Sequence, residues 1–186
     1  MVKKMVVADT TVKFKGFFHF KMFYKLLHDW LWDEGFRDFK GGDQYFETLH
    51  LQKETAVGKE IIIKWSCQND LYKSNYYRQQ IDIEYHCLEL KPAEAMYKGK
   101  KITINHGEVE LQIKGILLVD YANKIEEHPI LGTFEKFLRE KILNKQLENL
   151  ERDFYRDVMR LQGTMKAYVH MKTFSQAVET LEKPRW

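Results

Sequence analysis

Two segments in the middle of the chain alternate between apolar and polar residues, and this pattern restricts the fold more than any other feature. Side chains of a β-strand point alternately to the two faces of a sheet, so a period of two indicates a strand with one buried face and one wet face. Antiparallel sheets allow this asymmetry, whereas parallel sheets are usually buried on both faces. The pattern therefore predicts an antiparallel sheet. Its apolar positions are Ile61, Ile63, Trp65 and Cys67 in the first segment and Ile81, Ile83, Tyr85 and Cys87 in the second.

Further strands follow from shorter or less regular versions of the same pattern. Gly16 closes the first of them, and Gly115 takes an inward position in the longest. A glycine at an inward position predicts a bend, a bulge or an aromatic ring packed on the backbone. We expect five or six strands in all, the additional ones at residues 12–15, 45–52, 102–104 and 109–121.

Two helical segments flank the strands. Apolar residues between Phe18 and Glu34 recur with the period of a helix, and Gly35 is placed where such a helix would end in the left-handed conformation. After Pro129 the period becomes helical again, with Thr133 as a candidate N-cap. One face of this second helix carries the apolar stripe Leu143, Leu147, Leu150, Phe154, Val158, Leu161, Met165, Tyr168 and Val169.

The stripe changes face near residue 170. Phe174, Val178 and Leu181 project on the side opposite to it. A single helix over residues 134–181 would be about 70 Å long, roughly twice the width of a compact chain of this size. The C-terminal part therefore either folds back or packs on a partner, and these three side chains are candidate interaction residues.

Taken together, the segments predict an α+β fold. We expect a curved antiparallel meander of five to six strands packed on an N-terminal helix, followed by a long C-terminal helical segment. The chain has 186 residues, of which 44% are hydrophobic, which is enough for one sizeable core. We divide it into a sheet domain over residues 1–132 and a helical segment over 133–186 that packs on the sheet and on a partner.

This order of elements resembles the helix-grip arrangement of START-like proteins, in which a curved sheet wraps a helix. START-like proteins place more secondary structure between their first two strands than this chain does. The resemblance concerns architecture only and supplies no function, because one fold hosts many functions. An apolar ligand between the sheet and the helices is suggested instead by the inward side chains, which are aromatic enough to line a cavity. The inward aromatic and aliphatic residues that would line such a cavity are Trp65, Ile83, Tyr85, Leu111 and Tyr121.

Charge and cysteine content favour an intracellular protein that is not a dedicated nucleic-acid binder. The formal net charge is +3, too small to indicate a dedicated nucleic-acid binder. Cys67 and Cys87 are too few for a disulfide framework, so we expect two reduced, buried thiols. No apolar run approaches the ~20 residues that span a bilayer, and the first ten residues do not predict a signal peptide. We expect a cytoplasmic location.

No motif for a nucleotide, a zinc ion or a catalytic nucleophile appears in the sequence, and we expect no cofactor. The most suggestive polar group is Asp82, Glu84 and His86, which must share the outer face of one strand. Carboxylates and an imidazole in this arrangement could bind a divalent metal or act as acids and bases. The alternative is a solvated face whose charges pair with Lys64 and Lys114 on neighbouring strands.

Several aromatic residues lie outside the apolar faces and are candidate contact residues. Trp32 projects onto the polar side of the first helix, where it either packs under the C-terminal helix or contacts a partner. Tyr72, Tyr76 and Tyr77 crowd the tip of a hairpin beside basic residues. They could stack on single-stranded nucleic acid, or they could simply be strand formers.

Four functional hypotheses remain, in decreasing order of preference. The first is a non-enzymatic structural or protein-interaction module that assembles through its C-terminal helices, with a protein partner or a second copy. The second is a helix-grip-like module that binds an apolar small ligand. The third is an enzyme that uses Asp82, Glu84 and His86, and the fourth is a protein associated with nucleic acid or ribonucleoprotein.

Overall fold

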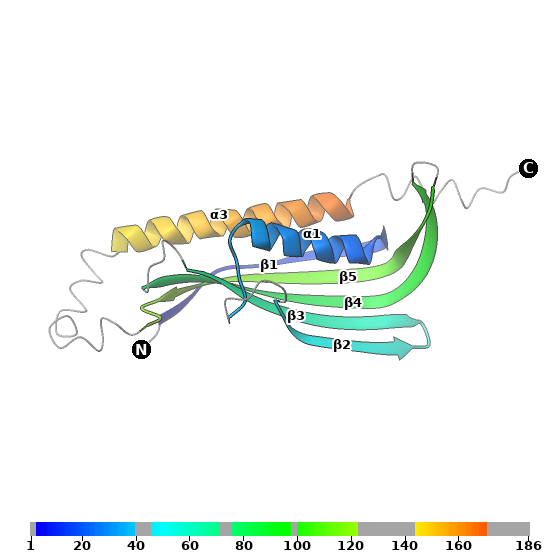
Figure 1. The fold of residues 1–186 in the computed structure, drawn as a ribbon, viewed down its shortest axis with the longest axis horizontal. Helices are drawn as coiled ribbons and strands as arrows, with labels where there is room; N and C mark the ends of the chain where they lie inside the picture. The colour runs from blue at the N-terminus through cyan, green and yellow to red at the C-terminus, as the bar shows by residue number, and fades with distance from the viewer. Residues whose placement is uncertain (1–2, 40–45, 71–75, 98–99, 123–143, 171–186) are drawn as a thin grey trace, which may run out of the picture.

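The computed structural model describes residues 3–39, 46–70, 76–97, 100–122 and 144–170. Within these ranges the chain runs from strand to helix, through a series of antiparallel strands, to a second long helix (Figure 1). The elements are β1 (Lys3–Phe18), α1 (Phe20–Asp33), β2 (Glu47–Thr55), β3 (Gly58–Asp70), β4 (Tyr77–Tyr97), β5 (Lys100–Val119) and α3 (Asn144–Val169).

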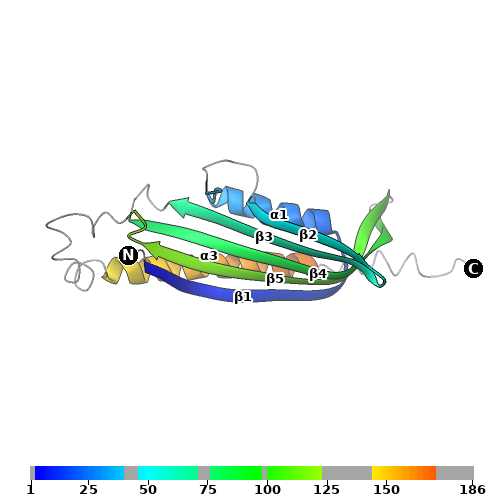
Figure 2. The same cartoon turned by 90° about the horizontal axis from the view of Figure 1, so that it is seen from below.

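The described strands form one five-stranded antiparallel sheet in the order β1-β5-β4-β3-β2. The first strand therefore lies beside the last, and β1 and β2 are the two edges. Both α1 and α3 pack on the same face of the sheet, as the views from the front and from below show (Figures 1 and 2). Within the described ranges nothing covers the opposite face, which we call the outer face. The predicted α+β class with an antiparallel sheet is confirmed.

The alternation of β3 and β4 orients their side chains as the sequence predicts. Ile63 and Trp65 on β3 and Ile83 and Tyr85 on β4 are almost fully buried beneath the helices. Ile63 lies opposite Tyr85 in the register, and Trp65 lies opposite Ile83. Inward residues of neighbouring strands thus meet in direct cross-strand pairs, which are the unit that stabilises a sheet.

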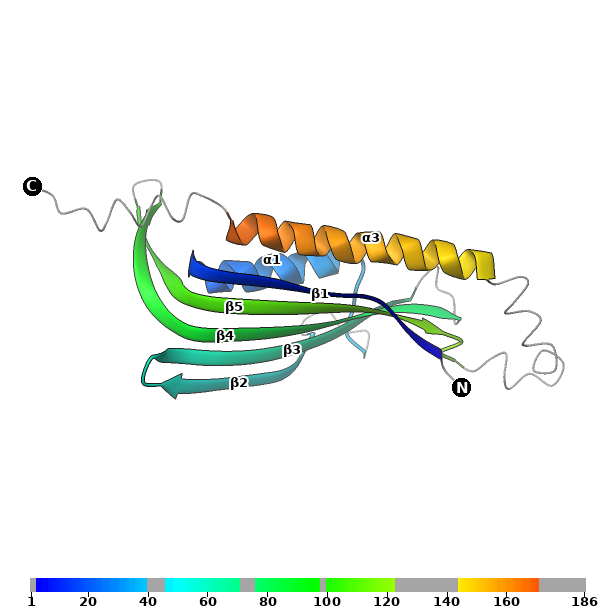
Figure 3. The ribbon, with the colours of Figure 1, turned by 180° about the vertical axis from the view of Figure 1, so that it is seen from behind.

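β5, which pairs with β4 in a hairpin, is one strand where two were expected. Residues 102–104 and 109–121 were expected to form two strands, but β5 is continuous over both. Gly107 does not end the strand, because it lies where β4 bulges between Leu88 and Lys91. A Cβ at Gly107 would stand 2.8 Å from the carbonyl oxygen of Leu88. Beyond this bulge the β4–β5 hairpin curls toward the side of the sheet that carries the helices (Figure 3).

The first strand is likewise longer than expected. It extends from Lys3 to Phe18, so Gly16 lies inside β1 and does not close it. Gly16 is paired with Gly107 of β5 in the ladder. A glycine usually weakens a strand. Here β1 continues beyond Gly16 because its pairing with β5 continues on both sides of that residue.

α1 begins and ends with local signals. The Nδ1 atom of His19 accepts a hydrogen bond from the backbone N–H of Met22 at 3.3 Å and so caps the N-terminus. At the other end Gly35 has a φ of +85°, the left-handed conformation that the sequence predicts there. The buried side chains of the helix are Phe23, Leu27 and Leu31.

α3 confirms part of the predicted C-terminal helical segment. The stripe residues from Phe154 onward are buried against the sheet and α1, whereas Leu147 and Leu150 are half-buried. The predicted N-cap at Thr133, the domain boundary at residue 132 and the change of face after residue 170 lie outside the described residues. Among the helices that the structure describes, none is both long and apolar enough to cross a membrane.

Gly115 of β5 explains how α3 approaches the sheet so closely. A Cβ at this position would lie 2.8 Å from Cγ2 of Val158 and 3.3 Å from ring carbons of Phe154. The neighbouring strand β1 shifts register beside it, between Val6 and Ala8. The predicted ring on the backbone of Gly115 is thus present, and a bulge lies next to it on β1.

Candidate functional site

Asp82, Glu84 and His86 share the outer face of β4, but each is engaged with different neighbours. The Oδ1 atom of Asp82 accepts hydrogen bonds from Ser66 Oγ at 2.5 Å and from Gln80 Nε2 at 2.9 Å. The other two residues contact side chains of β3. Lys64 Nζ forms an ion pair with Glu84 Oε2 at 2.7 Å, and His86 Nε2 lies at hydrogen-bond distance, 3.0 Å, from Glu60 Oε1.

This arrangement does not bring the three candidates to one point. Across the described residues, no group of three histidine, cysteine or acidic side chains could hold a metal ion. The expected partner Lys64 does bind Glu84, whereas Lys114 faces Asp82 in the register and places its Nζ 3.4 Å from Asp9. The outer face of β4 therefore carries cross-strand polar pairs, which stabilise a sheet by a few tenths of a kcal/mol to about 1 kcal/mol each.

A shallow hollow of about 350 Å³ lies over this part of the outer face. The charged residues that line it are two basic ones, Lys64 and Lys114, and two acidic ones, Asp82 and Glu84. Because the opposite charges are equal in number, the hollow carries no excess charge that would select an anion or a cation. This hollow thus offers hydrogen-bonding groups, but no net charge that would attract a charged ligand.

Trp32 is covered by a residue of the following loop. The guanidinium carbon of Arg37 stands 3.6 Å from the centroid of the indole, and Arg37 Nη1 donates to the carbonyl oxygen of Trp32 at 3.0 Å. The indole is half-buried and packs against the core. A cation over the indole face is a favourable contact. The guanidinium covers one face of the indole. An intermolecular contact at Trp32 stays a prediction.

The hairpin tyrosines lie closer to the core than their sequence position indicates. Tyr77 is 7% exposed, and burial raises the pKa of its hydroxyl to about 12. The rings of Tyr76 and Tyr77 meet edge to face at 4.6 Å. Arg78 is engaged with Asp70 at 2.5 Å. Tyr77 also lines a hollow of about 310 Å³ beneath α3, with Gln146, Asn149, Leu150 and Asp153.

The remaining sequence candidates fall outside the described residues. In the sequence, Tyr72 falls between β3 and β4, and Phe174, Val178 and Leu181 come after α3. Their assignment as interaction residues therefore stays a prediction.

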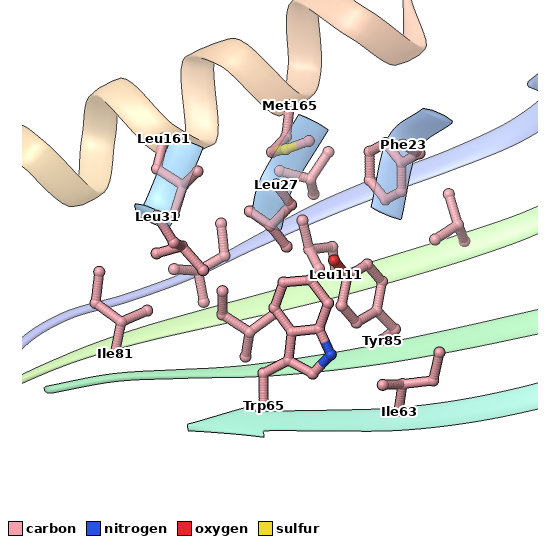
Figure 4. Close-up of a cluster of buried hydrophobic side chains, with 14 of the residues drawn as sticks. Phe23, Leu27, Leu31, Ile63, Trp65, Ile81, Tyr85, Leu111, Leu161 and Met165 are labelled. Carbon is pink, nitrogen blue, oxygen red and sulfur yellow. The ribbon is translucent and has the colours of Figure 1, made fainter. Parts of the chain in front are cut away.

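The space between the sheet and the helices is filled by side chains in the part of the chain that the structure describes. Figure 4 shows Trp65 and Tyr85 rising from the sheet toward Leu27 and Leu31 of α1 and Met165 of α3. The rings interlock edge to face: Trp65 lies 4.6 Å from Tyr24 and 5.3 Å from Tyr85 between ring centroids. Most of the residues expected to line an apolar cavity belong to the packed core instead. The exception is Tyr121, which is half-buried in the turn after β5.

Two buried thiols belong to this core, as the sequence predicts. Cys67 and Cys87 are free and buried, on neighbouring strands. Burial raises the pKa of Cys87 to about 12. Burial, together with the charge of Asp82, raises the pKa of Cys67 well above its ordinary value. Since the thiolate is the reactive form, neither residue has the environment of a catalytic nucleophile.

We expect both thiols to be inert in the folded protein. A colorimetric thiol reagent at pH 8 should label neither cysteine under native conditions and both in denaturant, because unfolding removes the burial that suppresses the thiolate. The readout is the number of thiols labelled per chain over time. Rapid labelling of one thiol without denaturant would show that its part of the core opens readily.

The most open surface is one that the sequence did not single out. β2 is exposed along nearly its whole length, and Leu49 and Leu51 are 36% and 53% exposed on the outer face. Leu51 lies opposite Ile62 of β3, which is half-buried on the same face. We call this surface the open edge: the outer-face side chains Leu49, Leu51 and Ile62 together with the free side of the β2 backbone.

The backbone on the free side of β2 can be assigned from the register. Ser66 of β3 donates to Phe46 at 2.9 Å, and Gln68 exchanges two 2.8 Å bonds with Arg37, so even-numbered β3 residues direct their backbone groups toward the β2 side. Their opposite residues on β2 are odd-numbered, from Leu49 to Thr55. Because the direction alternates along an antiparallel ladder, the N–H and C=O groups of the even-numbered residues face away from the sheet. These residues are His50, Gln52 and Glu54.

A weak signal for this surface was present in the sequence. Leu49 and Leu51 alternate with polar residues, as in any half-buried strand. Nothing in the local pattern tells which strand will lie at the edge or which face will remain uncovered. Comparison with known proteins adds no assignment, because no protein-family model matches the chain and no curated protein matches it significantly.

Proposed function

We propose that this chain is a non-enzymatic protein-interaction module and that the open edge is one of its binding surfaces. The observation that carries the proposal is the exposure of β2 on both faces and along its free side. Phe174, Val178 and Leu181 remain a second proposed contact, through which the C-terminal segment would assemble with a partner.

An exposed strand edge is a ready template for another strand. Its unpaired backbone groups give affinity, while side chains on alternate positions give specificity. At the open edge, His50, Gln52 and Glu54 supply the backbone groups, and Leu49 and Leu51 supply apolar area on the outer face. A partner strand would bury both at once.

The other edge of the sheet is less suited to this role. β1 carries four lysines among its sixteen residues and shifts register between Val6 and Ala8, both devices that discourage edge pairing. It is also contacted by α3, where Gln162 donates to Thr10 and to the carbonyl oxygen of Thr11. The two edges thus differ, and β2 is the better candidate for pairing.

The alternatives have less support from the described residues. An apolar ligand between sheet and helices would require Trp65 and Tyr85 to move apart, and their rings are in contact. Stacking on nucleic acid would require exposed tyrosines, and Tyr77 is buried. These hypotheses remain proposals of lower rank.

The proposal predicts that a single substitution at Leu51 prevents the chain from binding its partner. Leu51→Lys should abolish binding of the chain to its partner, whether a different protein or another copy, because it places a charge in the surface that is to be buried. Met22→Lys is the matched control, since Met22 on α1 is also about half exposed. Affinity purification from the native source, with stoichiometry measured for each variant, is the experiment.

The outcomes are distinct. Loss of a stoichiometric partner from Leu51→Lys with retention by Met22→Lys supports the open edge as the surface. If both variants retain the partner, the partner binds at a surface other than the open edge. A chain that binds no other protein, and does not bind itself at about 100 µM, would overturn the proposed function.

A further inference from the structure

We propose that the occupant of the open edge is a second copy of this chain, with β2 paired antiparallel to β2 about a two-fold axis at Leu51. This inference rests on the proposed function and names its partner. It is carried by the self-complementarity of β2: one register of the strand against itself satisfies the backbone, the apolar side chains and the charges together.

The backbone requirement limits the registers. Hydrogen-bonded pairs between two copies can form only between residues whose N–H and C=O groups face the free side, which are His50, Gln52 and Glu54. With the axis at Leu51, His50 lies opposite Gln52 of the second copy, and this pair occurs twice by symmetry. Leu51 then lies opposite itself in a pair that is not hydrogen-bonded. In such pairs the Cα atoms are only about 4.5 Å apart, so the side chains are closest.

The apolar side chains fit the same axis. Leu51 is already opposite Ile62 on β3, and both project to the outer face. Pairing at Leu51 creates a continuous row across the joined sheets: Ile62 and Leu51 of one copy, then Leu51 and Ile62 of the other. Leu49 lies opposite Lys53 of the second copy, whose aliphatic stem can cover it. The exposed leucines of β2 thus become part of a shared apolar surface.

The charges argue against other axes. An axis at Lys53 would oppose two lysines directly, and an axis at Glu54 would oppose two glutamates, both of which destabilise a ladder. An axis at Gln52 avoids like charges, but it places Leu51 opposite Lys53 and Leu49 opposite Thr55, so the leucines do not meet. An axis at His50 would extend the pairing to the segment between Glu47 and Leu49, where the β2 register is irregular.

No strand of the described sheet lies beyond β2, which is the outermost strand in both side views (Figures 1 and 3). In the view from below, α1 lies along the same side of the molecule, on the face that carries the helices (Figure 2). A two-fold axis perpendicular to the sheet keeps α1 and α3 of both copies on one face and leaves the outer faces continuous. A single strand pair buries little surface, so the dimer should be weak and concentration-dependent.

Cysteine crosslinking of the full chain tests the register. Leu51→Cys should form a disulfide-linked dimer under mild oxidation, because a cross-strand pair that is not hydrogen-bonded has a suitable spacing. Lys53→Cys is the matched control on the same face, since Lys53 lies opposite Leu49 of the second copy and not opposite itself. The native cysteines are buried and should not contribute. Mass and non-reducing electrophoresis give the readout.

Sedimentation velocity at about 100 µM tests the association itself. The wild-type chain should sediment partly as a dimer, and Leu51→Lys should weaken dimerisation at least about tenfold, since it opposes two lysines at the axis. Gln52→Pro, which removes an N–H from the free side without touching the β3 ladder, should weaken it similarly. Met22→Lys should leave it unchanged.

Three results would overturn the inference, each in its own way. Crosslinking of Lys53→Cys or of Gln52→Cys, with none for Leu51→Cys, would move the axis. A wild-type dimer that survives both Leu51→Lys and Gln52→Pro would place self-association elsewhere. A monomeric chain that loses a different protein partner through Leu51→Lys would leave the proposed function standing and remove the second copy as its partner.

Discussion

Replacing Trp65 by alanine should lower the free energy of unfolding by about 3 to 5 kcal/mol. Trp65 is 2% exposed. Its ring centroid lies 4.6 Å from that of Tyr24 on α1 and 5.9 Å from that of Phe46, the residue before β2. Alanine would leave a cavity that rings on three elements cannot close, so both the transfer energy and the packing energy are lost. Urea unfolding followed by circular dichroism measures the difference.

Tyr85→Phe is the matched control in the same cluster. The hydroxyl of Tyr85 is fully buried and has no hydrogen-bond partner among the described residues, as Figure 4 shows it pointing into the apolar cluster. Removing it keeps the ring and relieves the cost of a buried polar group, so stability should be unchanged or rise by up to about 1 kcal/mol. A loss below about 1 kcal/mol for Trp65→Ala would contradict a packed core and restore the apolar-ligand hypothesis.

The core was predictable because its signal is local. A period of two places Trp65 and Tyr85 on the buried face whatever the strands pair with, and a period of 3.6 does the same for Phe154 and Val158 on α3. The left-handed stop at Gly35 is likewise a property of a single residue. Such features need no knowledge of the tertiary structure.

Strand length was harder to predict because pairing decides it. Gly16 and Gly107 have poor strand propensity, yet both lie inside strands, paired with each other in the β1–β5 ladder. At Gly107 the close carbonyl of Leu88 requires a residue without a side chain. The local pattern predicted a strand end at Gly16 and left Gly107 between two expected strands, whereas pairing places both inside strands and makes Gly107 a required residue of the sheet.

Some features of the candidate site were likewise predictable from the local sequence, and others were not. The outer-face position of Asp82, Glu84 and His86 followed from alternation. Lys64 was expected as a cross-strand partner of this face, but alternation does not tell that it pairs with Glu84, because that depends on the register of β3 and β4. The open edge did not follow, because the position of β2 at the edge depends on the order of all five strands. Strand order is set by non-local contacts, and the exposure of Leu51 is its consequence.

Gly115→Ala should destabilise the protein by about 1 to 3 kcal/mol, although it adds a single methyl group. The new Cβ would stand 2.8 Å from Cγ2 of Val158, a short branched side chain with little freedom to move away. Relief requires α3 to rise from β5, which loosens the other stripe residues. Gly163→Ala is the matched control: it lies in α3 with no atom within 4 Å of the added methyl and should stabilise by up to about 1 kcal/mol.

A double-mutant cycle separates this clash from a general effect on the strand. Val158→Ala alone should cost about 2 kcal/mol through lost buried methyl groups. Combined with Gly115→Ala, it removes the atom that clashes, so the two costs should fall short of additivity by at least about 1 kcal/mol. Equal costs of Gly115→Ala in both backgrounds would mean that backbone freedom at residue 115 matters and contact with α3 does not. The measured coupling therefore tells whether Gly115 is present to let α3 dock, which is the step that joins the C-terminal helix to the sheet.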